Sequence, residues 1–142
     1  MAFNILIVDD SLPMRSVIKK TIKVSGFKVG QLFEAPDGRA ALDILKDQWL
    51  DLVLTDYHMP DMNGLELVEN MKKDELLKAI PVVVITTEGS QQKHEEFIEK
   101  GAAGFIKKPF TPEEIREKLN LILGESGYGE GSSENGDEGL DF

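Results

Sequence analysis

The sequence predicts an α/β protein in which a parallel five-stranded sheet is covered by helices on both faces. Short apolar runs alternate with amphipathic segments five times along the chain, which is the pattern of repeated strand–helix units. Several of the runs are too uniformly apolar to leave one face of a sheet in water. The chain is short, and no glycine-rich loop follows its first strand. These observations favour a flavodoxin-like, doubly wound (βα)5 sheet with strand order 2-1-3-4-5 over a dinucleotide-binding fold.

The first strand–helix unit is a buried strand at residues 3–8 followed by a helix. Ser11 is the expected N-cap of that helix, and Pro13 is tolerated because it lies in the first turn. Gly26 is expected to end the helix in the left-handed conformation that glycine adopts without steric cost. The expected apolar face consists of Val17, Ile18, Thr21, Ile22 and Val24.

The second and third units repeat this arrangement. The strand at residues 29–35 is less apolar, so we place it at an edge of the sheet, and Asp37-Gly38 then caps a helix. The third strand, at residues 52–55, ends on Asp56, and Asn63-Gly64 leads into a helix over residues 65–72. Asn-Gly is also a hairpin signal, but the helical period that follows favours a loop into a helix. The residues expected to be buried are Ala40, Ala41, Leu42, Ile44 and Leu45 in the second helix and Leu65, Leu67, Val68 and Met71 in the third.

The fourth and fifth units complete the pattern. Strands are expected at residues 81–87 and 103–106. The helix at residues 91–100 is mostly polar, with Phe97 and Ile98 as its clearly apolar residues, so it should be the most loosely packed helix. The last helix begins at the N-cap Thr111 and is expected to bury Ile115, Leu119, Ile122 and Leu123. His58 and His94 are expected to be exposed residues of a loop and a helix.

Length and composition exclude several classes of protein. A chain of 142 residues suits one domain, and the absence of cysteine excludes disulfides, thiolate metal sites and cysteine nucleophiles. The apolar runs near the N-terminus are interrupted by Asp9 and Asp10, and no apolar window approaches the length of a membrane span. We therefore expect a cytoplasmic protein. The net charge of −10 does not suit a nucleic-acid binder.

The composition changes at residue 124. We expect a folded domain at residues 1–123 and a flexible, acidic tail rich in glycine and serine at residues 124–142. The tail is interpreted as a solvated end. The alternative is a short docking peptide, because Leu140 and Phe142 restore two apolar groups at its end. Its acidic residues are Glu125, Glu130, Glu134, Asp137, Glu138 and Asp141.

Residues that can carry chemistry follow four of the five expected strands. Asp9 and Asp10 end the first, Asp56 ends the third, Thr86 ends the fourth, and Lys108 follows the fifth. The carboxyl ends of parallel strands meet at one edge of a sheet, so these side chains should lie close together. Clustered carboxylates repel one another, and a hard dication such as Mg²⁺ relieves that repulsion. The adjacent hydroxyl and ammonium groups suit a phosphoryl group, with Asp56 as the nucleophile that receives it.

The chain resembles the receiver domain of bacterial two-component response regulators over residues 3–123, and is similar in form to the stand-alone chemotaxis regulators of that family. The resemblance depends on four motifs in order along the chain. They are Val-Asp-Asp-Ser (8–11), Thr-Asp-Tyr-His-Met-Pro-Asp-Met-Asn-Gly (55–64), Ile-Thr-Thr-Glu (85–88) and Gly-Ala-Ala-Gly-Phe-Ile-Lys-Lys-Pro-Phe (101–110).

The resemblance implies a role for each matching residue. Asp56 is implied to be the phosphoacceptor. The implied Mg²⁺ ligands are the carboxylates of Asp9, Asp10 and Asp56 and the main-chain carbonyl of His58.

The same resemblance implies how the phosphate is sensed. Thr86 is implied to be the switch hydroxyl, Phe105 the switch aromatic residue and Lys108 the lysine that contacts the phosphate. The peptide bond between Lys108 and Pro109 is implied to be cis. The resemblance also implies that His58 and Glu88 occupy positions that flank the phosphate and tune the lifetime of the phosphoryl group.

The resemblance therefore implies a single-domain response regulator, which we expect to act as a monomer. A sensor histidine kinase would phosphorylate Asp56, and the change would alter a protein-binding face made by the fourth helix, the fifth strand and the last helix, in chemotaxis or flagellar motor control. With no effector domain expected after residue 123, the expected downstream target is a motor switch protein, a phosphatase or a phosphotransfer protein, and not a nucleic acid or a membrane. The chain is not expected to be an enzyme beyond its own phosphorylation and dephosphorylation.

Four alternatives stay open at this point. The chain could be a phosphorelay intermediate, a kinase-regulating receiver, or a receiver that binds partners without being phosphorylated. It could also be a phosphatase of the haloacid dehalogenase type, which uses similar residues on a parallel sheet. That class is disfavoured because Asp9 and Asp10 are adjacent in place of an Asp-x-Asp pattern, and because no late acidic pair follows Lys108.

Overall fold

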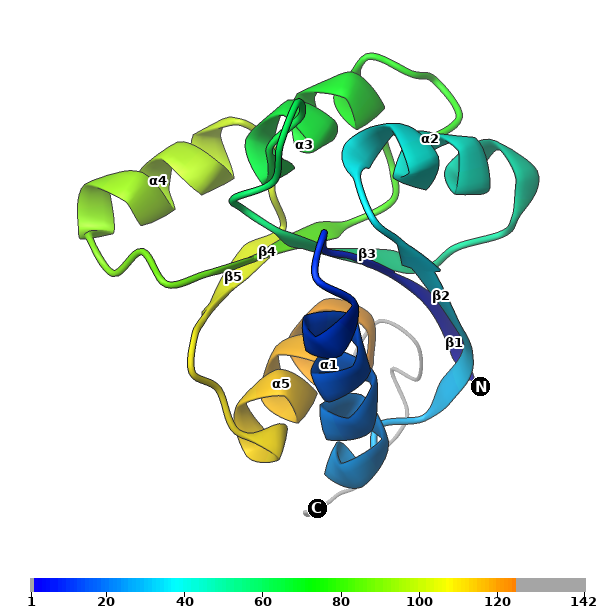
Figure 1. Cartoon of the computed structure of the whole chain (residues 1–142), viewed down its shortest axis with the longest axis vertical. Helices are drawn as coiled ribbons and strands as arrows, with labels where there is room; N and C mark the ends of the chain where they lie inside the picture. The colour runs from blue at the N-terminus through cyan, green and yellow to red at the C-terminus, as the bar shows by residue number, and fades with distance from the viewer. Residues whose placement is uncertain (1, 125–142) are drawn as a thin grey trace.

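Five parallel strands form one sheet in the spatial order β2-β1-β3-β4-β5 (Figure 1). The computed structural model describes residues 2–124. The expected fold class, the strand order and the edge position of the second strand are all confirmed. The two strands that lead into the acidic residues, β1 and β3, are neighbours. The strand bounds are β1 (Phe3–Val8), β2 (Val29–Ala35), β3 (Leu52–Asp56), β4 (Val82–Thr86) and β5 (Gly104–Lys107).

Helices cover both faces of this sheet (Figure 1). On one face α1 (Leu12–Ser25) lies beside α5 (Pro112–Leu119), and the Arg116 guanidinium of α5 donates to the main-chain carbonyl of Ser25 at 3.1 Å. The other face carries α2 (Gly38–Asp47), α3 (Gly64–Lys72) and α4 (Gln91–Glu99). Each helix follows a strand after a short loop, so its first turn lies near the edge of the sheet where the strands end.

Polar caps fix where the helices begin. In each case the cap side chain accepts a hydrogen bond from a main-chain N–H of the first turn, which would otherwise lack a partner. Gly26 ends α1 with φ of 84°, the left-handed conformation expected for it. The caps are Ser11, Asp37, Asn63, Ser90 and Thr111.

The central strands are buried on both faces because their side chains alternate between two helical layers. One layer packs alternate residues such as Ile5, Leu54 and Ile85 against α1 and α5. The other layer packs the intervening residues, such as Leu6 and Val53, against α2 and α3. This double burial explains why the strands read as continuous apolar runs.

The buried stripe of α1 is narrower than the sequence indicates. Ile18 and Ile22 are buried, but Val17 and Val24 are 51% and 68% exposed, so their expected burial is wrong. Residues four apart lie one above the other on a helix, and this stripe alone faces the sheet and α5.

The last helix also differs from the expectation. Regular α5 ends at Leu119, and a wider, π-helical turn follows at Asn120–Gly124. That turn buries Leu123, while Ile122 is only partly buried. The expected acidic tail, with Leu140 and Phe142, lies outside the described residues apart from its first residue. Within residues 2–124, the structure has no helix long and apolar enough to cross a bilayer.

Candidate functional site

Three carboxylates meet where β1 and β3 end. Val8 pairs with Thr55 across these two strands, so the next residues along the two strands are Asp9 and Asp56. Asp10 follows Asp9 directly. One carboxylate oxygen from each of the three aspartates lies within 4.8 Å of the other two. The parallel register therefore brings together acids that are 47 residues apart or less, as the strand-end argument predicts.

Asp9 is the most deeply buried of these acids. Its side chain is 1% exposed, and its Oδ1 accepts a hydrogen bond from the Ser11 N–H at 2.8 Å. Its Oδ2 is buried and has no hydrogen-bond partner among the residues that the structure describes. Burial raises the pKa of this carboxyl above its usual value; the Ser11 N–H partly offsets that rise, and repulsion from Asp56 adds to it.

This donor set fits a hard divalent cation. Such cations prefer oxygen ligands, and Mg²⁺ is typically bound through one or two carboxylates together with waters and phosphate oxygens. A buried carboxylate oxygen without a partner is costly, and a bound cation would satisfy it. The acidic cluster of Asp9, Asp10 and Asp56 could therefore hold such an ion.

Asp56 also has a basic partner from the far end of the chain. The Lys108 ammonium lies 3.2 Å from Asp56 Oδ1, and both side chains are largely shielded from water, at 19% and 11% exposed. The main-chain N–H of Lys108 donates to the carbonyl of Thr86 at 2.7 Å, which ties the end of β5 to the end of β4. The bond from Lys108 to Pro109 is cis, as the resemblance implies.

A glycine keeps the main chain close behind Asp56. A Cβ on Gly64 would lie 2.6 Å from the Asp56 carbonyl oxygen, closer than real contacts allow. The Gly64 N–H donates to the carbonyl of Tyr57 at 2.9 Å, which closes the loop between β3 and α3. Asn63 and Glu66 then form a reciprocal cap at the start of α3. The Asn63-Gly64 pair thus leads from a loop into a helix, as the sequence predicts, and does not form a hairpin turn.

Thr86 and Phe105 are joined by a chain of contacts through Glu88 and His94. Thr86 is 1% exposed, and its hydroxyl oxygen accepts from the Glu88 N–H at 2.9 Å. The Glu88 carbonyl lies 2.7 Å from Nε2 of His94, and the imidazole of His94 stacks on the Phe105 ring with centroids 3.7 Å apart. A carbonyl can only accept, so Nε2 of His94 carries the proton.

The two histidines differ from each other. His58 is exposed, as expected, with its ring against Tyr57 at 4.6 Å. His94 was expected to be a plain exposed helix residue, and that expectation is wrong, since it is partly buried between the Glu88 carbonyl and Phe105. The α4 helix presents His94 next to β5, a proximity that only the tertiary fold creates.

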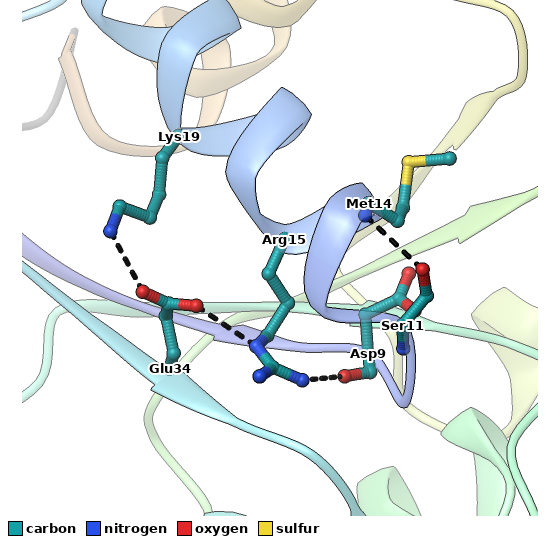
Figure 2. A network of polar contacts seen from close by, with 6 residues as sticks. All are labelled: Asp9, Ser11, Met14, Arg15, Lys19 and Glu34. Carbon is teal, nitrogen blue, oxygen red and sulfur yellow. Dashed lines mark hydrogen bonds and ion pairs between the residues drawn. The ribbon is translucent and has the colours of Figure 1, made fainter.

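Sequence reasoning missed a second polar cluster next to the acids. Figure 2 shows Arg15 between the main-chain carbonyl of Asp9 and the carboxylate of Glu34, with Lys19 on the other oxygen of Glu34. One signal was available, because Arg15 lies one helical turn after the cap Ser11 and helical side chains lean toward the N-terminus. Nothing in the local sequence pairs Glu34 with that turn.

Comparison with known proteins gives consistent matches. Residues 5–120 match the family model of the response regulator receiver domain. The chemotaxis protein CheY-3 of Vibrio cholerae is 43% identical over 120 residues, covering 84% of this chain and 91% of that protein. A chemotaxis protein CheY homologue of Campylobacter jejuni is 39% identical over 132 residues, covering 92% of this chain and 99% of that protein. The solved structure of the Vibrio cholerae chemotaxis response regulator CheY4 has a TM-score of 0.77 and 32% identity, covering 87% of this chain and 100% of that one.

Proposed function

The chain belongs to the response regulator receiver family, and on this premise we propose that it is a single-domain regulator phosphorylated on Asp56 by a sensor histidine kinase. The observation that carries the proposal is the position of Asp56, which ends β3 with two further carboxylates within 4.8 Å and the Lys108 ammonium at 3.2 Å. An ordinary ion pair would not need the two additional acids. A carboxylate that receives a phosphoryl anion in the presence of a cation does need further acids, because they hold the cation.

Asp56 is the nucleophile in this proposal. Transfer forms a bond between a carboxylate oxygen of Asp56 and phosphorus, and it breaks the bond between phosphorus and the imidazole nitrogen of a phosphohistidine. Lys108 already lies against Oδ1, so its charge is in place to stabilise the oxygens of the incoming group. Phosphoryl transfer depends chiefly on such positioning and charge stabilisation.

Asp9, Asp10, Asp56 and the main-chain carbonyl of His58 are the proposed ligands of Mg²⁺. A bound Mg²⁺ supplies positive charge that offsets the repulsion between the carboxylates and the phosphoryl oxygens. The partnerless Oδ2 of Asp9 supports this assignment, since it is the buried oxygen that lacks any other partner among the described residues.

Thr86 and Phe105 form the proposed readout. The Thr86 hydroxyl oxygen accepts from the Glu88 N–H, and the hydroxyl could donate its own hydrogen to an oxygen of a phosphoryl group on Asp56 by turning toward it and away from the Glu88 N–H. That change would release Glu88, whose carbonyl holds His94, and His94 in turn packs on Phe105. Phosphorylation would thereby shift a pre-existing equilibrium of the surface around α4, β5 and α5.

This surface is the proposed binding site for the downstream protein. A groove of about 320 Å³ runs between β5 and α5, and the Lys118 ammonium lies 5.5 Å from the Phe105 ring centroid. The relatives are named as chemotaxis proteins, which favours a flagellar motor switch protein as target over a role as phosphorelay intermediate or kinase regulator. The groove is lined by Phe105, Ile106, Lys107, Glu114, Glu117, Lys118 and Leu121.

The test is the intact mass of the full chain after incubation with acetyl phosphate, with and without Mg²⁺, followed by mapping of the modified residue. We expect a Mg²⁺-dependent gain of one phosphoryl group on Asp56. The Asp56→Asn variant should lose this uptake and keep its fold, because asparagine has nearly the same shape and can still accept from Lys108.

A matched control lies in the loop that follows β3. Asp61 is exposed and has φ of 68°, a left-handed conformation that asparagine also tolerates, so Asp61→Asn should leave uptake unchanged. Full uptake by Asp56→Asn, or no uptake by the folded parent chain, would contradict the proposal. The second result would favour a receiver that binds partners without being phosphorylated.

A further inference from the structure

We propose that Arg15 is a positioning residue for the acidic cluster: it fixes Asp9 through the main-chain carbonyl of that residue, and Glu34 holds Arg15 in place. The inference rests on the proposed function, because the positioning serves the binding of a divalent cation. Arg15 itself is no ligand in this proposal, since its side chain is cationic and contacts the main chain of Asp9 and not its carboxylate.

The contacts of Arg15 bridge two elements (Figure 2). Its Nη1 donates to the Asp9 carbonyl at 2.6 Å, and its Nε donates to Glu34 Oε1 at 2.9 Å. The side chain is 13% exposed, so both bonds are mostly shielded from water. A guanidinium can make both bonds at once because it presents several N–H donors in a rigid fork. A lysine ammonium has no such fork.

Asp9 is restrained at three points. Its N–H donates to the Ala35 carbonyl of β2 at 3.1 Å, its carbonyl accepts from Arg15, and its Oδ1 accepts from the Ser11 N–H. These bonds fix the peptide units on both sides of the Cα and one carboxylate oxygen. The remaining oxygen, Oδ2, is the buried one without a partner. Arg15 therefore contributes one of the restraints that leave this oxygen available to a cation.

Glu34 anchors the arginine from the edge strand. Its second oxygen accepts from Lys19 at 2.8 Å, and Glu34 pairs with Ile7 in the register of β1 and β2. The hydrogen bonds from Lys19 and Arg15 lower the pKa of Glu34, so its carboxylate is charged at neutral pH. Arg15 is thus held between the Asp9 carbonyl and the Glu34 carboxylate. Lys19 also bonds to Glu34 but has no observed bond to Asp9.

The charge of Arg15 and its positioning role predict opposite changes in the affinity for Mg²⁺ when Arg15 is replaced. Removing a positive charge next to the acidic cluster should tighten the binding of a dication if charge alone mattered. Loss of positioning should weaken that binding. Groups that orient metal ligands typically change metal affinity by roughly 10- to 100-fold when they are replaced.

The experiment is isothermal titration of the full chain with Mg²⁺ at constant ionic strength. We expect the Kd of Arg15→Gln to rise by about 10-fold or more. The matched control is Lys19→Gln, which removes the same charge and also frees one oxygen of Glu34, and its Kd should stay at the parent value or fall. The double variant Arg15→Gln with Glu34→Gln should bind no more weakly than Arg15→Gln alone, because Glu34 acts through the arginine.

Unfolding measured without Mg²⁺ separates positioning from stability. All titrations are made where each variant is fully folded, so a merely structural role of Arg15 would change the unfolding midpoint and leave Kd alone. If Arg15→Gln does not fold, Arg15→Lys replaces it and should still weaken binding, since one ammonium cannot reproduce the fork. A Kd for the folded Arg15 variant equal to that of Lys19→Gln would overturn the inference.

The outcomes also distinguish this inference from the proposed function. If the parent chain binds Mg²⁺ and Asp9→Asn does not, the cation site stands, and an unchanged Arg15→Gln overturns the positioning role alone. If the folded parent chain binds no Mg²⁺, the proposed cation site and the inference fall together.

Discussion

Asp9 and Glu34 are carboxylates at the same end of the sheet, yet their surroundings are opposite. Asp9 belongs to an acidic cluster, is buried, and has one oxygen with no hydrogen-bond partner among the described residues. Glu34 belongs to an ion-pair network in which Arg15 and Lys19 each bond one of its oxygens. Accordingly the pKa of Asp9 is raised by burial, and the pKa of Glu34 is lowered by its two partners.

The difference shows that one carboxylate is left available to a ligand while the other stabilises the fold. A buried charge that its own protein leaves uncompensated raises the free energy of the empty fold, and it is retained where a ligand completes it. A compensated charge stabilises the fold and has nothing left to offer a ligand. Arg15 connects the two regions, because it contacts both Asp9 and Glu34.

The largest expected effect comes from neutralising the uncompensated acid. In Asp9→Asn, Mg²⁺ binding should weaken by more than about 100-fold, because a ligand is lost and not merely an orienting group. Without Mg²⁺ the same variant should be more stable than the parent, since an ionised buried group becomes neutral. Titration calorimetry and urea unfolding without added metal measure the two effects.

A loss of stability in Asp9→Asn would contradict the claim that the Asp9 carboxylate is uncompensated. It would mean that the Asp9 carboxylate is compensated in the unliganded protein. Asp10→Asn is the matched control, since Asp10 is exposed and should give a smaller gain in stability.

A smaller effect of opposite sign is expected from the compensated acid. Glu34→Gln should reduce the free energy of unfolding by about 1 kcal/mol, because two charge-assisted hydrogen bonds at a partly exposed site are replaced by neutral ones. Chemical unfolding at neutral pH, without Mg²⁺, measures this difference. An increase in stability would show that the network is strained or poorly formed in solution.

The smallest expected effect is the pH dependence of the contributions that Glu34 and Asp9 make to stability. This dependence tests the difference between the two carboxylates more finely. The folded pKa of Glu34 is below its usual value of 4.5, so its stabilising contribution is complete above pH 4.5 and is lost as the pH falls through the folded pKa. The folded pKa of Asp9 is above its usual value of 3.8, so its destabilising contribution is absent below pH 3.8 and appears as the pH rises through the folded pKa.

Each variant should therefore approach the parent chain in acid, from opposite directions. Urea unfolding of the parent, Glu34→Gln and Asp9→Asn over about pH 3 to 7 would reveal this convergence. A difference for Glu34→Gln that stays constant across that range would mean that the charge of Glu34 contributes nothing to stability.

Much of this architecture could be predicted because it depends on local patterns and one topological rule. The caps Ser11 and Thr111 and the glycine at position 26 act within a few residues of their place in the chain. The sharing of one sheet edge by Asp9 and Asp56 follows from parallel strands alone. Alternation of apolar and amphipathic segments was enough to supply those strands.

The features that could not be predicted arise between elements. Arg15 and Glu34 meet because α1 lies over the edge strand, and His94 meets Phe105 because α4 lies over β5. The exposure of Val17 has the same origin, since the helical period gives a face but the neighbouring α5 decides how wide the covered stripe is. Pairings of this kind need the packing of the helices and not only their existence.

The ion pair between Lys108 and Asp56 joins residues that are 52 positions apart, and Lys108 directly follows β5, the fifth strand along the chain. During synthesis on the ribosome, the three aspartates emerge well before this lysine does. A nascent chain that has not yet released the residue after β5 therefore carries the three aspartates without the lysine that pairs with Asp56. Asp56 therefore obtains its basic partner only after the chain has been synthesised through residue 108.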